Sequence, residues 1–116
     1  MSLAETKEEL FKKGIIDERR IFSCATAQNL PDGSFGLVGI GFKGDTFVVC
    51  DANPAGLTGV EVGKVLYEIP VSEISDVKGS NFVLNRYVNF SWQGAKFGFK
   101  AFANNLGIID ILKGNK

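Results

Sequence analysis

The chain has 116 residues, of which 45% are hydrophobic and 22% charged, so it fits one globular domain with a single core. Thirteen basic residues balance thirteen acidic ones, which excludes the positive surplus that nucleic-acid binding depends on, and histidine, the commonest general base and metal ligand, is absent. No apolar run approaches the roughly 20 residues of a membrane span and no signal peptide is visible, so we expect a cytoplasmic protein with no nucleic-acid partner.

The first predicted element is a short amphipathic helix over residues 3–13. Leu3, Leu10 and Phe11 recur at helical spacing, two glutamates stand four residues before two lysines, and Gly14 is placed to end the helix. The apolar stripe is narrow, so the helix needs a docking surface, either its own domain or a second copy of the chain. We therefore divide the chain into an N-terminal helical extension, residues 1–14, and a barrel domain, residues 15–116.

Apolar and polar residues alternate from Ile21 onward, which predicts seven short strands: residues 21–28, 35–43, 46–51, 64–69, 74–78, 87–93 and 95–102. Turn-forming residues separate them at 31–34, 44–45, 79–81 and 85–86, and residues 53–56 are predicted as the longest loop. Gly39 and Gly41 indicate a bend in the second strand. Pro70 cannot donate to a strand ladder, so the fourth strand ends there.

The last two strands show the clearest alternation. One face carries Val88, Phe90, Trp92, Ala95, Phe97, Phe99 and Ala101, and the other carries Tyr87, Asn89, Ser91, Gln93, Lys96 and Lys100. The aromatic row is either a core face or a platform for stacking nucleic-acid bases, and its alternation with polar residues favours the core. Asn104 or Asn105 can then begin a final helix whose Leu106, Ile108, Ile109 and Leu112 form a buried face, with Gly114 as its end.

The residues available for chemistry form no recognised catalytic or metal-binding pattern. Cys24 and Cys50 lie inside apolar strands and are predicted to be small buried hydrophobes, and two thiolates without histidine would leave a zinc site half filled. The carboxylate pairs of Asp17 with Glu18 and of Glu73 with Asp76 lie beside turns or helix starts, where they have capping roles. We therefore predict no enzyme activity, no catalytic or metal-binding residue and no cofactor.

The segment at positions 67–77, YEIPVSEISDV, resembles the strand, Ile-Pro and short excursion found in bacterial pleckstrin-homology-like (PH-like) and GRAM-like domains. In those domains two strands like those at 87–102 follow. The resemblance covers most of the chain in element order and residues 67–102 in sequence. It implies a mainly β fold, a seven-stranded antiparallel PH-like barrel with a C-terminal capping helix, to which the short N-terminal helix is an addition.

The resemblance also implies a module that binds a lipid headgroup, a peptide or another protein. The first loop, QNLPDGS at 28–34, departs from the inositide-binding pattern because it holds one acid and no cation. Lys96 and Lys100 share one strand face across Gly98, which is either a solvated face or a surface for a partner or an anionic membrane.

We expect a protein partner or self-association rather than lipid binding, although no ligand-binding residue is identified. Self-association would use an unpaired edge strand or the N-terminal helix. The alternative is a barrel that binds a small ligand or lipid headgroup, or an enzyme on the same scaffold.

Overall fold

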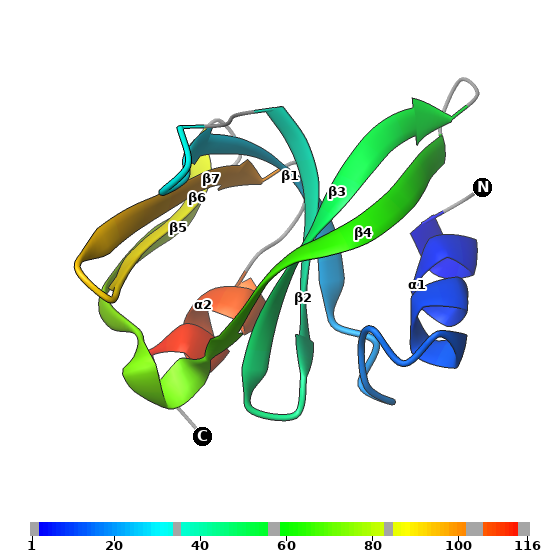
Figure 1. Cartoon of the computed structure of the whole chain (residues 1–116), viewed down its shortest axis with the longest axis horizontal. Coiled ribbons are helices and arrows are strands. Elements are labelled where there is room, and N and C mark those ends of the chain that lie inside the picture. The colour runs from blue at the N-terminus through cyan, green and yellow to red at the C-terminus, as the bar shows by residue number, and fades with distance from the viewer. Residues whose placement is uncertain (1–2, 34–35, 56–58, 83–84, 102–105, 114–116) are drawn as a thin grey trace.

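The protein is mainly β, with seven strands and two short α-helices, in a computed structural model that describes residues 3–33, 36–55, 59–82, 85–101 and 106–113 (Figure 1). The elements in chain order are α1 (Leu3–Lys12), β1 (Phe22–Asn29), β2 (Gly36–Lys43), β3 (Thr46–Ala55), β4 (Gly59–Pro70), the 3-10 turn η1 (Val71–Glu73), β5 (Ser75–Phe82), β6 (Asn85–Trp92), β7 (Ala95–Ala101) and α2 (Leu106–Leu112). The predicted set of seven strands with a helix toward each end is confirmed.

All seven strands belong to one antiparallel sheet in the order β4-β3-β2-β1-β7-β6-β5. The sheet bends so that β5, β6 and β7 face the part of the β2-β3-β4 ribbon that lies near the β2–β3 turn, with α2 between them (Figure 1). Among the described residues the two edge strands, β4 and β5, are not hydrogen-bonded to each other, so the ladder does not close into a barrel. The fold is therefore an open, bent sheet with one helix on its inner side.

Some residues predicted in turns or loops lie inside strands, and these predictions were wrong. Residues 53–55, expected in a loop, end β3, where Asn53 pairs with Glu61 and Pro54 with Val60. Residues 79–81 continue β5, and residues 85–86 already belong to β6. Cross-strand pairing in the long hairpins overrides the local turn preference of Gly, Asn and Pro. The predicted end of β4 at Pro70 is confirmed.

The core lies on the concave side of the sheet and is built around phenylalanine. Phe47 is fully buried and makes edge-to-face contacts with Phe42, Phe90 and Phe99, at ring-centroid distances of 5.3, 5.4 and 6.0 Å. Each fully buried ring contributes about 2–3 kcal/mol relative to an exposed one. The aromatic row of β6 and β7 therefore faces the core, as predicted.

Trp92, at the end of this row, is half-buried and packs on the core rather than standing in solvent. Its ring centroid lies 6.2 Å from that of Phe97, and its indole Nε1–H donates to Glu73 Oε1 at 3.0 Å. That hydrogen bond attaches η1 to β6. It gives Glu73 a structural role instead of a place in a carboxylate pair.

The C-terminal helix packs on β5 through a position that has no side chain. Ile108, Ile109 and Leu112 are buried in the main core. A Cβ atom at Gly79 would lie 2.7 Å from Ile109 Cδ1 and 2.8 Å from its Cγ1. Because such contacts are too short for carbon atoms, Gly79 is what allows α2 to approach the sheet. The proposed N-cap residues 104–105 and Gly114 lie outside the described residues.

Helix α1 docks on the outer face of its own sheet. The sequence had left open whether the helix packs on its own domain or on a second copy of the chain. Leu10 is 2% exposed and forms a second apolar cluster with Ile16 and Phe22. The Phe22 ring lies over Gly39, where a Cβ atom would come within 2.4 Å of the ring. The glycines of β2 therefore make room for this cluster, a role that their local sequence did not reveal.

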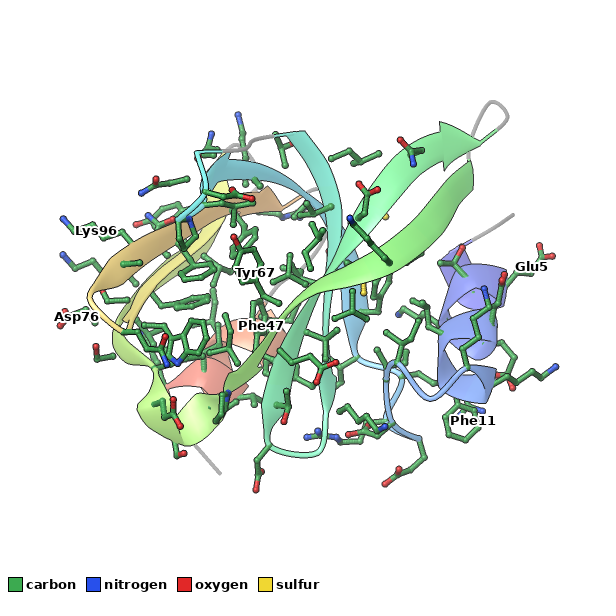
Figure 2. The ribbon with its side chains drawn as sticks, viewed as in Figure 1. Glu5, Phe11, Phe47, Tyr67, Asp76 and Lys96 are labelled. Atoms are coloured by element: carbon green, nitrogen blue, oxygen red, sulfur yellow. The ribbon has the colours of Figure 1, made fainter. Side chains whose placement is uncertain are left out.

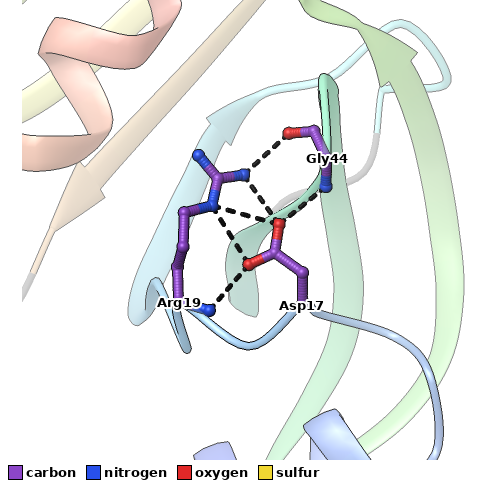
Figure 3. A network of polar contacts seen from close by, with 3 residues as sticks. All are labelled: Asp17, Arg19 and Gly44. Carbon is purple, nitrogen blue, oxygen red and sulfur yellow. Dashed lines mark hydrogen bonds and ion pairs between the residues drawn. The ribbon is translucent and has the colours of Figure 1, made fainter.

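Ion pairs and a hydrogen-bond network secure α1 and the segment after it. Lys13 pairs with Glu9 at 2.8 Å, as the four-residue spacing predicts, whereas Glu8 pairs with Arg20 at 2.8 Å. Figure 3 shows the adjoining network, in which Arg19 Nη2 donates to Asp17 Oδ2 at 2.7 Å and to the Gly44 carbonyl at 2.7 Å. The Gly44 amide in turn donates to Asp17 Oδ2 at 2.7 Å. The network fastens the α1–β1 connection to the β2–β3 turn.

Candidate binding surface

Both cysteines have thiols with raised pKa values. Burial and the Glu68 carboxylate raise the pKa of the Cys50 thiol to about 11, and burial also raises the pKa of Cys24. A thiol with a raised pKa supplies little thiolate at neutral pH and is a poor nucleophile. The two thiols are free. Cys50 is buried as predicted, but Cys24 is only half-buried and packs against the apolar cluster of Leu10, Ile16 and Phe22. Within the described ranges, no three potential ligands gather in a metal-binding group.

Exposed polar side chains instead cover the outer face of β5, β6 and β7. Strand register puts Lys78 opposite Asn89, and Asn89 opposite Gly98, in one row across the three strands. Lys96 and Lys100 follow on β7, two residues to either side of Gly98. Lys78, Lys96, Lys100 and Asn89 are all exposed, and together we call them the lysine face. Figure 2 shows Lys96 at the end of the molecule opposite to Glu5 and Phe11 of α1.

The lysine face is hollowed over Gly98. A depression of about 420 Å³ lies there. Its lining includes both polar residues and two buried phenylalanines: Gln28, Asn29, Asp76, Lys78, Asn89, Phe90, Ser91, Lys96, Phe97 and Gly98. A neighbouring depression of about 320 Å³ is lined by Gln28, Lys78, Tyr87, Asn89 and Lys100. The missing side chain at Gly98 opens the space between the two lysines of β7. The result is a shallow, open groove whose exposed side chains are polar, instead of an enclosed apolar pocket.

The lysine face carries a local positive surplus in a chain of zero net charge. Asp76 is the one carboxylate that lines the groove among the described residues, against three lysines. In the part of the chain that the structure describes, none of these lysines forms an ion pair, whereas Lys13, Arg19 and Arg20 each bind a carboxylate. The ammonium groups of the lysine face are therefore not neutralised by a carboxylate of the described residues, which leaves them available to an anionic partner.

Asp76 lies at an irregularity of β5. Its φ of 54° is in the left-handed region, and the register with β6 shifts between Ser75 and Lys78. An extra residue of this kind bends an edge strand and twists it away from regular pairing. The bulge therefore sets the direction in which Lys78 leaves β5, toward the same face as Asn89.

The first loop differs from the lysine face in charge. Leu30 is buried, the Gly33 amide donates to the Leu30 carbonyl at 3.0 Å, and Asp32 is exposed. Tyr67 of β4 packs edge-to-face on Phe97 at 5.2 Å, and burial, followed by the Asp32 carboxylate, raises its pKa. A cation-free turn beside a half-buried tyrosine offers little to a phosphorylated headgroup.

Sequence reasoning found part of this surface. Lys96, Lys100, Asn89 and Gln93 are exposed as predicted, but Tyr87, predicted to be exposed, is half-buried because it stands between Ser80 and Lys100 in the middle of the face. The contributions of Lys78 and Gln28 were missed. The alternation in β5 could have placed Lys78 outward, but only the sheet order brings β5 and β1 to either side of the β6–β7 hairpin.

Comparison with protein-family models, with curated proteins and with solved structures finds no match. The resemblance to PH-like domains therefore stays a prediction from sequence and element order. Within the described residues, neither helix has the length and apolar character needed to cross a membrane.

Proposed function

We propose that the chain is a non-enzymatic interaction module of the PH-like type, whose lysine face contacts a partner protein. The observation that carries the proposal is the group of three lysines, without an ion pair among the described residues, around an open polar groove. The element order of seven strands and a C-terminal helix supports the PH-like part. A cytoplasmic location belongs to the same proposal, because both thiols are free, as is usual in a reducing compartment.

A protein partner suits this surface better than a membrane or a small molecule. Phe90 and Phe97 are the phenylalanines in the lining of the depressions, and both are buried. Among the described residues that line the face, the exposed side chains are polar, so none of them can insert an apolar group below the lipid headgroups. The two depressions are lined mainly by exposed side chains, whereas small-molecule sites bury most of their ligand against apolar walls. An open polar groove is typical of the rim of a protein interface.

Self-association is a second form of the same proposal, and an edge strand is a better route to it than the N-terminal helix. The buried Leu10 of α1 already packs on its own chain, so that the helix offers little apolar surface to a second copy. The edges of β4 and β5 are the remaining route, because backbone groups at an unpaired edge can accept another strand.

The test is capture from a lysate of the native cells, combined with sedimentation of the purified chain across a range of concentrations. We expect the immobilised chain to retain a defined protein, and a variant with all three lysines of the lysine face changed to glutamine to lose it. A chain that retains nothing and stays monomeric at every concentration would refute the proposed function.

A further inference from the structure

We infer that the lysine face binds an extended acidic segment of its partner, with carboxylates on alternate residues. The inference rests on the proposed function and specifies the chemistry of the partner. It comes from the spacing of the three cations, from the donors around them and from the shape of the groove.

The cations are too far apart to share one small anion. Lys96 and Lys100 are four residues apart on β7, so their Cα atoms are about 13 Å apart. Lys78 lies two strands away from Gly98, about 10 Å across the sheet. The three attachment points therefore form a wide triangle around Gly98. An extended peptide places the side chains of alternate residues on one face, about 7 Å apart. On that face, residues four apart in the peptide are about 13 Å apart, which matches the separation of the two lysines along β7.

The groove also lacks the donors that usually hold a phosphate group. β6 and β7 pair with each other in regular register beneath the middle of the groove, so the ladder uses their backbone amides there. The register shifts only at the sides of the groove among the described residues, next to Gln28 on β1 and Asp76 on β5. Lysine offers a point charge and not the two-pronged geometry with which arginine binds phosphate. A set of separate charges over a paired sheet suits separate carboxylates.

The floor of the groove presents side-chain amides. Gly98 is buried, and a Cβ atom there would stand 3.1 Å from Asn89 Oδ1 and 3.5 Å from the Asn29 Cβ, so the glycine lets these two side chains close over the backbone of β7. The side-chain amides of Gln28 and Asn89 line both depressions and can donate to or accept from a peptide bond. In this arrangement the lysines bind carboxylates of the acidic segment at the two sides of the groove, while the side-chain amides contact the backbone of that segment.

The experiment uses a fluorescent peptide of alternating Glu and Thr and a second peptide of the same composition with contiguous glutamates. Anisotropy is measured with the intact chain, and amide chemical shifts locate the site. We expect the alternating peptide to bind more tightly than the block peptide, to shift Asn89, Gly98 and Lys100, and to weaken as salt rises from about 0.05 to 0.5 M.

Two variants of equal net charge separate the site from general electrostatics. One changes the three lysines of the lysine face to glutamine, and the control changes three exposed lysines elsewhere, Lys12, Lys43 and Lys64, to glutamine. The first should weaken the alternating peptide about tenfold or more, and the control should change affinity less than about twofold. Thermal melting checks that both variants fold.

Each other outcome overturns the inference. Equal losses in both variants, or equal affinity for the two peptides, would show attraction to net charge alone. Tighter binding to inositol hexakisphosphate or to phosphatidylserine vesicles, lost in the first variant, would assign the lysine face to phosphate groups. Capture of a native protein that the first variant retains would keep the chain an interaction module, would place the contact outside the lysine face, and would reject this partner chemistry.

Discussion

Adding one methyl group at Gly79 tests the packing of α2 against the sheet. In Gly79→Ala the new Cβ would lie 2.7 and 2.8 Å from two carbons of Ile109 and 3.0 Å from the Tyr87 carbonyl oxygen. Overpacking of this kind costs about 1–3 kcal/mol, and replacing a strand glycine returns about 0.5–1 kcal/mol. We expect a net loss of about 1–2 kcal/mol, which lowers the Tm by about 4–8 °C for each kcal/mol.

The assay is urea unfolding followed by Trp92 fluorescence, in a double-mutant cycle with Ile109→Ala. The Ile109 change alone should cost about 3 kcal/mol, and the double variant should cost less than the sum of the two because the clash disappears. Gly98→Ala is the matched control: it adds the same methyl group on the outer face, 3.1 Å from a movable amide oxygen, and should change stability by less than about 0.5 kcal/mol. A Gly79→Ala chain as stable as the wild type, or additive effects in the cycle, would refute the packing described for α2.

The remaining predictions concern three other contacts. The Arg19 guanidinium lowers the pKa of Asp17 to about 2, so the carboxylate stabilises the fold above its unfolded pKa of 3.8 and loses this effect as pH falls through about 2. Asp17→Asn should therefore lower the free energy of unfolding by about 1 kcal/mol at neutral pH and make stability depend less on pH in the acid range. An unchanged pH dependence in the acid range would contradict the hydrogen-bond network. Leu10→Ala should cost about 2–3 kcal/mol in urea unfolding, and a cost below about 0.5 kcal/mol would mean that α1 does not dock on the sheet. The Cys50 thiol should react with a disulfide reagent at about pH 8 only after unfolding, and reaction at the rate of free cysteine would contradict its burial and raised pKa.

The sequence was most informative where one face of a strand meets the core and the other meets water. Val88, Phe90, Phe97 and Phe99 alternate with polar residues, so the period alone located the β6–β7 hairpin and its inner face. The end of β4 at Pro70 was also predictable, because proline has no amide hydrogen to donate.

The sequence was least informative at positions where the residue type depends on a contact with a residue far away in the chain. Gly79 was predicted in a turn, yet it pairs with Val88 within β5. The side chain of Ile109, thirty residues later in the chain, occupies the space that a Cβ at this position would need. Gly39 indicated a bend but accommodates the Phe22 ring. A glycine demanded by close packing and a glycine demanded by a turn look alike in one sequence.

The candidate surface shows the same limit. Two of its lysines lie on one strand and were recognised together, whereas Lys78 joins them only through the pairing of β5 with β6. Strand order depends on which edges find each other in three dimensions, and alternation within a strand does not encode it. Element content could thus be predicted, and the composition of a surface that crosses several strands could not.

The short β2–β3 turn contacts two other segments of the chain, the α1–β1 connection and η1. Gly44 exchanges hydrogen bonds with Asp17 and Arg19, and the next carbonyl, that of Asp45, accepts from the Val71 amide at 2.8 Å where η1 begins. Lengthening this turn would disrupt both of these connections at once. The β6–β7 turn, where Gln93 and Gly94 are exposed and both have left-handed φ values, is the hairpin into which a protein engineer should graft an epitope tag or a fluorophore site.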